Sequence, residues 1–119
     1  MRWLVIWVLC AAAGCKDPPP PPAPEGPAAP AMPATEVKRS QDACKAYVDK
    51  VCACADALPA MKQPCALAHA LPEAVQVDLD VAANPESSRR DALQAQDSVR
   101  KIVKECIEQT ARLPSAGCP

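Results

Sequence analysis

Apolar residues recur at helical spacing in the first half of the candidate folded region. Between residues 40 and 57 the stripe consists of Cys44, Val48, Val51, Cys52 and Ala55. This spacing predicts an amphipathic helix. Ser40 is the expected N-cap, because its hydroxyl can accept a hydrogen bond from a first-turn N–H group. Pro59 is expected to end the helix.

A second stripe predicts a long helix near the end of the chain. Asn84-Pro85-Glu86 supplies the expected N-cap, first-turn proline and early acid. Asp97 with Lys101, and Lys104 with Glu108, are expected ion pairs on the solvated side. Pro114 and Gly117 lie beyond the end. The stripe itself consists of Leu93, Val99, Ile102, Val103, Cys106 and Ile107.

The region between these two helices is less regular. A helix is expected from about residue 60 to 70, with Pro64 in its first turn and Pro72 permitting a restart or kink. Residues 74–82 fit both a strand, by the alternation of Val75, Val77, Leu79 and Val81, and a helix, by Ala74, Val77 and Val81. No second strand-like run exists to pair with them, so the sequence favours a short helix and an all-α domain.

The N-terminus carries a short apolar run. Arg2 precedes twelve uncharged, mostly apolar residues, 3–14, whereas a helix needs about 20 residues to cross a bilayer core. A positive start, a short apolar stretch and small residues are typical of a signal peptide. The alternative, a buried N-terminal helix, is disfavoured because a proline-rich stretch separates this segment from the rest.

That stretch holds nine of the 15 prolines within residues 18–33. Proline lacks an N–H group and fixes φ, so neither helix nor sheet is expected, only extended or disordered chain. Residues 16–34 would span roughly 60 Å in polyproline II. A spacer is favoured over a ligand for a proline-binding domain, because such domains are mainly cytosolic.

Composition limits what residues 35–119 can do. The segment has 85 positions, and a domain of that size buries only about 60–65% of its unfolded surface. Phe is absent, and Tyr47 is the only aromatic residue after the apolar N-terminal run. Such a core needs covalent staples. With 11 basic and 12 acidic residues in this segment, no positive field attracts nucleic acid, which excludes it as an expected partner.

Ala12-Ala13-Gly14-Cys15 resembles the lipobox of bacterial lipoproteins. The resemblance implies cleavage before Cys15 and acylation of that cysteine, with no consequence for the downstream fold. Two or three acyl chains would hold the protein on a membrane almost irreversibly. Lys16 replaces the Asp that retains family members in the inner membrane, so the outer membrane is favoured in a Gram-negative cell. The downstream segment resembles small cysteine-rich bacterial lipoproteins, a resemblance that implies no activity.

Cysteine counting agrees with this processing. Of eight cysteines, Cys10 would be discarded and Cys15 acylated, which leaves an even number. An even number in a small exported domain indicates disulfides. Fifteen pairings are possible. If the first and last helices are antiparallel, the expected pairs are 44–118, 52–106 and 54–65. The six remaining cysteines are Cys44, Cys52, Cys54, Cys65, Cys106 and Cys118.

Two other chemistries use the same residues. Cys52, Cys54, Cys65 and His69 are possible ligands for zinc or copper, but taking three thiols leaves an odd number to pair. A redox role for Cys52-Ala53-Cys54 is disfavoured, because both residues lie near a helix C-terminus, where the dipole disfavours a thiolate. Only one histidine exists, and no hydrolase motif surrounds it. Arg89-Arg90 with Lys38-Arg39 could form a basic patch, although a solvated helix face is favoured.

The sequence therefore predicts three parts: a signal peptide at 1–14, a lipidated cysteine with a proline-rich linker at 15–34, and an all-α, disulfide-stapled hairpin or bundle at 35–119. We expect a non-enzymatic interaction or structural module of the cell envelope, with no catalytic residues and no cofactor. Its partner would be an envelope protein or a cell-wall component. The alternative is a metal-binding or thiol-redox accessory protein.

Overall fold

A computed structural model of the protein describes residues 18–21 and 26–119. Over these residues all regular secondary structure is helical, which confirms the all-α prediction. The elements in chain order are α1 (Ala34–Ala57), the short 3₁₀ turn η1 (Pro59–Met61), α2 (Lys62–Ala68), α3 (Ala70–Ala83), α4 (Arg89–Arg112) and the 3₁₀ turn η2 (Pro114–Ala116).

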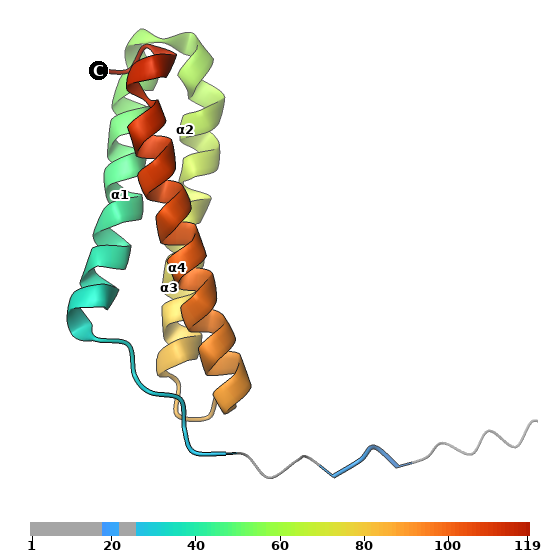
Figure 1. The fold of residues 1–119 in the computed structure, drawn as a ribbon. Helices are drawn as coiled ribbons and strands as arrows, with labels where there is room; N and C mark the ends of the chain where they lie inside the picture. Colours follow the sequence, from blue (N-terminus) through green and yellow to red (C-terminus); the bar gives the residue numbers. More distant parts are fainter. Residues whose placement is uncertain (1–17, 22–25) are drawn as a thin grey trace, which may run out of the picture.

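The helices form a three-armed bundle (Figure 1). α1 is the first arm, α2 and α3 together make the return arm, and α4 is the third. Only His69 separates α2 from α3, and its backbone is itself right-handed helical, with φ −60° and ψ −25°. Because the two shorter helices act as one return arm, α1 and α4 run in the same direction.

α1 starts earlier than its apolar stripe indicates. The carbonyl of Pro33 accepts hydrogen bonds from the N–H groups of Glu36 and Val37 at 2.9 and 3.0 Å. The prediction of Ser40 as the N-cap is therefore wrong: Ser40 is buried within α1, and its hydroxyl donates to the carbonyl of Glu36 at 2.8 Å. The expected end is confirmed, because Leu58, which precedes Pro59, is extended.

The ambiguous residues 74–82 lie within α3, as the favoured interpretation expected. Val75 and Leu79, four residues apart, are 1% and 7% exposed, whereas Val77 is 60% exposed. The burial therefore follows the helical period and not the strand-like alternation. The helical stripe expected from Ala74, Val77 and Val81 is nevertheless wrong, because Val77 is exposed and Ala74 and Val81 are only partly buried. Pro64 and Pro72 lie within the first turns of α2 and α3, where proline removes no intrahelical hydrogen bond.

α4 begins later than expected, at Arg89. The N-cap is Ser88, whose hydroxyl oxygen accepts from the N–H of Asp91 at 3.1 Å. The side chain of Asn84 instead accepts from the N–H of Glu86 at 2.9 Å and closes a turn before the helix. The prediction of Asn84 as the N-cap was therefore wrong, because asparagine can stabilise a turn as readily as a helix start.

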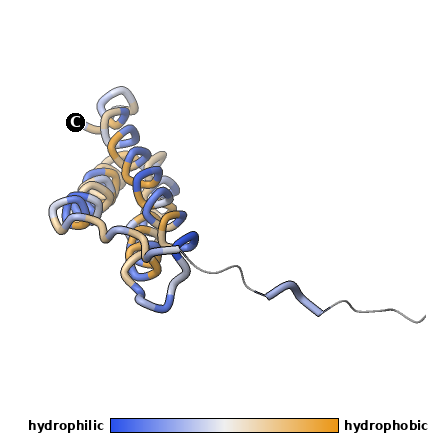
Figure 2. The backbone as a smooth tube through the Cα atoms, turned by 60° about the horizontal axis from the view of Figure 1, so that its bottom comes forward, coloured by the Kyte–Doolittle hydropathy of each residue, from blue (hydrophilic) through white to orange (hydrophobic). Residues whose placement is uncertain are grey.

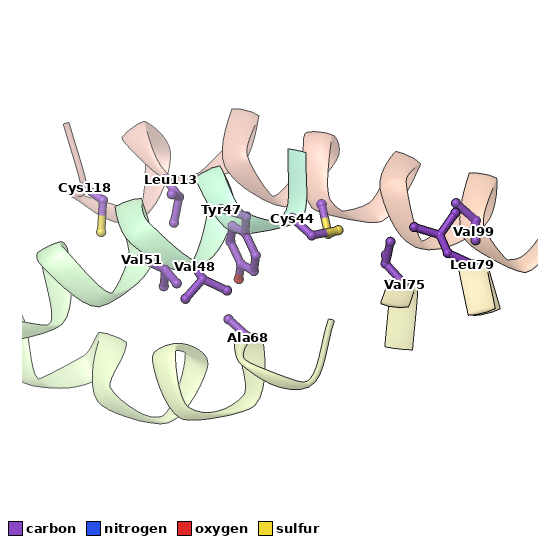
Figure 3. Packing of buried hydrophobic residues seen from close by; sticks show 11 residues of the cluster. Cys44, Tyr47, Val48, Val51, Ala68, Val75, Leu79, Val99, Leu113 and Cys118 are labelled. Carbon is purple, nitrogen blue, oxygen red and sulfur yellow. A yellow bond between two sulfur atoms is a disulfide. The ribbon is translucent and has the colours of Figure 1, made fainter. Parts of the chain in front are cut away.

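The core is built from small apolar side chains, as Figure 3 shows. Tyr47, Val48 and Val51 of α1 point into the space between the other arms, and Ala68 of α2 faces them. Along the tube in Figure 2, α4 alternates between hydrophobic and hydrophilic segments, as expected for a helix with one buried face.

The predicted stripe of α4 is confirmed at its centre and wrong at its edges. Val99 and Cys106 are fully buried, and Ile102 and Val103 are partly buried against the core. Leu93 and Ile107 are 39% and 45% exposed. The smaller side chains of Ala92 and Ala95, together with Gln96, take the buried positions at the start of the helix.

Part of the proline-rich segment lies against the bundle. Over residues 18–21 and 26–33 the segment forms no helix or strand, as expected. The guanidinium of Arg89 donates to the carbonyls of Pro27 and Ala28 at 2.7 and 3.2 Å. The amide of Gln96 donates to the carbonyl of Pro30 at 2.7 Å. Met32 packs against the core.

Candidate functional site

All six cysteines after residue 43 form disulfides: Cys44–Cys106, Cys52–Cys65 and Cys54–Cys118. The prediction that these six residues are disulfide-bonded is confirmed, but the three expected pairs are wrong. Those pairs assumed antiparallel first and last helices. The two links to the C-terminal part have nearly constant sequence separations of 62 and 64 residues, as parallel α1 and α4 require.

The chemically distinctive place is the disulfide between α1 and α2. Nε2 of His69 lies 3.6 Å from Sγ of Cys52. A disulfide sulfur carries no hydrogen, so any hydrogen bond here runs from the imidazole N–H to the sulfur. Cys52 and Cys65 are partly buried and His69 is exposed. Solvent therefore reaches this group of three side chains.

Helix geometry explains why these three residues meet. Cys65 and His69 are four residues apart on the return arm, so their side chains share one face. That face is turned toward Cys52 on α1. α1 and α2 are held side by side by the short connection through Leu58 and η1.

Cys54 is not part of this group. Two residues along a helix correspond to a rotation of about 200°, so Cys52 and Cys54 point to opposite sides of α1. Cys54 is bonded instead to Cys118. Of the four possible metal ligands indicated by the sequence, the structure brings together Cys52, Cys65 and His69 and excludes Cys54.

The possible basic patch is partly engaged elsewhere. Arg89 contacts carbonyls of the linker, and Lys38 forms a 2.7 Å ion pair with Asp42 on α1. The two ion pairs expected on α4 are present, with Lys101–Asp97 at 2.8 Å and Lys104–Glu108 at 3.8 Å. Much of the charge therefore lies in local pairs on the helix surfaces.

Sequence reasoning missed the residues that hold the linker, Arg89 and Gln96. The sequence does contain a pattern that could have identified Gln96. Gln96 follows Ala92 by four positions and therefore falls on the buried face of α4. A buried amide needs a hydrogen-bond partner. The partner is the carbonyl of Pro30 in the proline-rich segment, where the prolines carry no N–H group and no regular secondary structure pairs the carbonyls.

A shallow groove of about 250 Å³ lies between the linker, α1 and α3. Its walls include Met32, Val37 and Leu79, and the amide of Gln41 donates to the side-chain oxygen of Gln76 at 3.0 Å beside it. Large apolar side chains also lie exposed elsewhere, with Leu67 at 67% and Val77 at 60%. The groove and these side chains are apolar surfaces that another molecule can contact.

Cys10, Cys15 and the expected signal peptide lie outside the residues that the structure describes. Within the part that is described, no helix is long and apolar enough to cross a membrane. Comparison with protein-family models, curated proteins and solved structures finds no match for this chain.

Proposed function

We propose that the protein is a lipid-anchored, non-enzymatic interaction or structural module of the bacterial cell envelope. The observation that carries the proposal is the complete pairing of the six cysteines from Cys44 to Cys118. Disulfides persist in oxidising compartments outside the cytoplasm. The pairing leaves Cys10 and Cys15 as the two cysteines that need another role.

Acylation supplies that role for Cys15, and removal with a signal peptide accounts for Cys10. The carrying motif is Ala12-Ala13-Gly14-Cys15, which resembles a lipobox. Each buried acyl CH₂ contributes about 0.8 kcal/mol of membrane affinity. Lys16 favours the outer membrane of a Gram-negative cell.

The docked part of the linker shortens the proposed tether. Arg89 and Gln96 hold residues 27–30 on the bundle, so only residues 16–26 separate the anchor from the domain. Eleven residues reach about 40 Å at most. The domain would therefore stand close to its membrane, with the end near Arg89 facing the anchor and the end near Cys118 facing away.

The surface favours a protein or cell-wall partner over nucleic acid. The chain has a net charge of −1. Its helix surfaces carry lysines that are paired with nearby acidic residues, so the positive charges are locally balanced. Leu67 and Val77 offer exposed apolar side chains on the return arm. The three disulfides fix the arms relative to one another, which lowers the entropy lost when the domain binds.

The anchor is tested by metabolic labelling of the full chain with a fatty-acid precursor in a bacterial host. The wild type and a Cys10→Ser control should carry label, and Cys15→Ser should not. Label on Cys15→Ser would overturn the proposal. Counting free thiols in the unreduced, purified protein tests the assignment of the six domain cysteines to disulfides. Reactive thiols among these six would contradict the proposal.

The interaction is tested by placing a photo-crosslinking residue at Val77 in the anchored protein. A discrete adduct with an envelope protein or with cell-wall material should form, and the same crosslinker at the ion-paired Asp49 serves as the surface control. Equal adducts from both positions, or none from either, would count against a specific partner on the return arm.

A further inference from the structure

The group formed by Cys52, Cys65 and His69 is a ready set of soft metal ligands. The two sulfurs and an imidazole nitrogen all lie within 4.8 Å of one another. Thiolate and imidazole are the ligands that zinc and copper(I) prefer in proteins. In the oxidised protein the two sulfurs are bonded to each other, so they are not free to bind a metal.

The observed disulfide pairing allows a metal site that leaves no cysteine without a partner. A metal site made from Cys52, Cys54 and Cys65 would leave an odd number of cysteines. Cys52 and Cys65, however, are each other's partner. Opening that one bond releases both thiols and leaves Cys44–Cys106 and Cys54–Cys118 intact.

This disulfide is also the most accessible of the three. Both of its cysteines are partly exposed. Cys44 and Cys106 are each 0% exposed, and Cys54 is partly exposed but its partner Cys118 is 1% exposed. Thiol–disulfide exchange needs access to a sulfur, and the Cys52–Cys65 bond offers a reductant two partly exposed cysteines where Cys54–Cys118 offers one.

Features other than the bond also hold the three side chains near one another. Cys65 and His69 share a helix face, and α2 follows α1 after a four-residue connection, 58–61. Val51 and Ala68 pack in the same core beside the site. The two remaining disulfides still join α1 to α4 and to the C-terminal turn.

We propose that a dithiol reductant converts the Cys52–Cys65 disulfide into a binding site for a thiophilic metal ion. The dithiol transfers two electrons and two protons, becomes a disulfide, and leaves two protein thiols. The metal ion displaces both thiol protons and takes Cys52 Sγ, Cys65 Sγ and a nitrogen of His69 as ligands. Thiolates that share a tetrahedral zinc ion lie about 3.8 Å apart, which rotation about the cysteine side-chain bonds provides.

A site with three protein ligands suits zinc and copper(I). Zinc would bind a water molecule as its fourth ligand, and copper(I) would be bound by the three protein ligands alone. Both share the same thiolate and imidazole chemistry, so the experiment includes both. The proposal does not depend on the lipid anchor.

The first measurement is the order of reduction. The full chain is treated with increasing dithiothreitol, alkylated, and mapped by mass spectrometry. Cys52 and Cys65 should be labelled at concentrations that leave the cysteines of the other two disulfides, Cys44–Cys106 and Cys54–Cys118, unlabelled. Simultaneous labelling of all the domain cysteines would overturn the proposal.

The second measurement is metal binding after the dithiol has been removed without oxygen. Cobalt(II) should give the charge-transfer and d–d bands of a tetrahedral thiolate site in the reduced protein and not in the oxidised protein. Zinc should displace it, and copper(I) is titrated against a chromophoric chelator. All variants are prepared in the same way, so the state of Cys10 and Cys15 is the same in every sample, and differences between variants report on the site.

The variants decide between this site and adventitious thiol binding. The pair Cys52→Ser and Cys65→Ser should abolish the spectrum. His69→Gln should weaken binding by roughly tenfold or more, since loss of an outer-shell partner alone costs about 10–100-fold. Gln63→Ala, on the same short helix, is the control. Circular dichroism checks that the reduced protein stays helical. Unchanged affinity in His69→Gln, or loss of helix on reduction, would contradict the proposal.

Discussion

Cys44 and Cys106 join the middle of α1 to α4 across 62 residues, and neither is exposed to solvent. Ten residues further along α1, Cys54 is joined to Cys118, twelve residues beyond Cys106. Two links at matching intervals hold two parallel arms together. The Cys52–Cys65 bond has a different role, because it closes only the 13-residue step between neighbouring helices.

Loop length predicts which disulfide stabilises the fold more. Replacing Cys44 and Cys106 together by Ala should lower the free energy of unfolding by about 4 kcal/mol, and replacing Cys52 and Cys65 by about 3 kcal/mol. The first change also leaves a cavity in the core. Urea denaturation without reductant measures both. A larger loss for the 52–65 pair would contradict the assignment of the long links as the main staples.

Ser88 caps a helix and Ser40 does not, so the two serines should contribute differently to stability. Ser88→Ala should destabilise the protein by about 1 kcal/mol, because the hydroxyl that accepts from the Asp91 N–H is lost. Ser40→Ala should cost roughly nothing, because its hydroxyl donates to a carbonyl that belongs to a helical turn. Thermal unfolding of the two variants makes the comparison. A larger loss for Ser40→Ala would show that its buried hydroxyl contributes more than the cap.

The docked linker depends on Arg89 and Gln96. Arg89→Met removes the donors to Pro27 and Ala28, so residues 27–29 should become more mobile, while Gln96 still holds Pro30 and the bundle melts at nearly the same temperature. Backbone relaxation of Ala28 and Ala29, or the rate of proteolysis in this segment, reports the change. Arg90→Met is the matched control. Equal relaxation in both variants would show that Arg89 does not hold the linker.

The ion pair on α4 predicts a small pH effect. The hydrogen bond from Lys101, followed by its charge, lowers the pKa of Asp97, and the same contact raises the pKa of Lys101. The contribution of Asp97 to stability is therefore present above the ordinary carboxyl pKa and lost as the pH falls through the lowered value. The contribution of Lys101 is present below the ordinary amine pKa and lost as the pH rises through the raised one.

NMR titration of the Asp97 carboxyl carbon tests this pair directly. Lys101→Gln should move the pKa of Asp97 up, toward the ordinary carboxyl value. Lys104→Gln is the control, because Lys104 is paired with Glu108 and not with Asp97. Added salt should reduce the difference, since both groups are exposed. An unchanged pKa of Asp97 in Lys101→Gln would rule out the pair as its cause.

The sequence by itself determined the all-α class, because the helical spacing of Cys44 with Val48, and of Val99 with Cys106, is a local property of the chain, and because no second strand-like run exists to pair with residues 74–82. It also determined that Cys44, Cys52, Cys54, Cys65, Cys106 and Cys118 form disulfides, since their even number follows from counting. Only the tertiary structure decided the partners. Pairing depends on the direction of each arm, and the near-continuity of α2 and α3 at His69 makes α1 and α4 parallel. The group of Cys52, Cys65 and His69, and the contact of Arg89 with the linker, join residues from different arms, which no local pattern can specify.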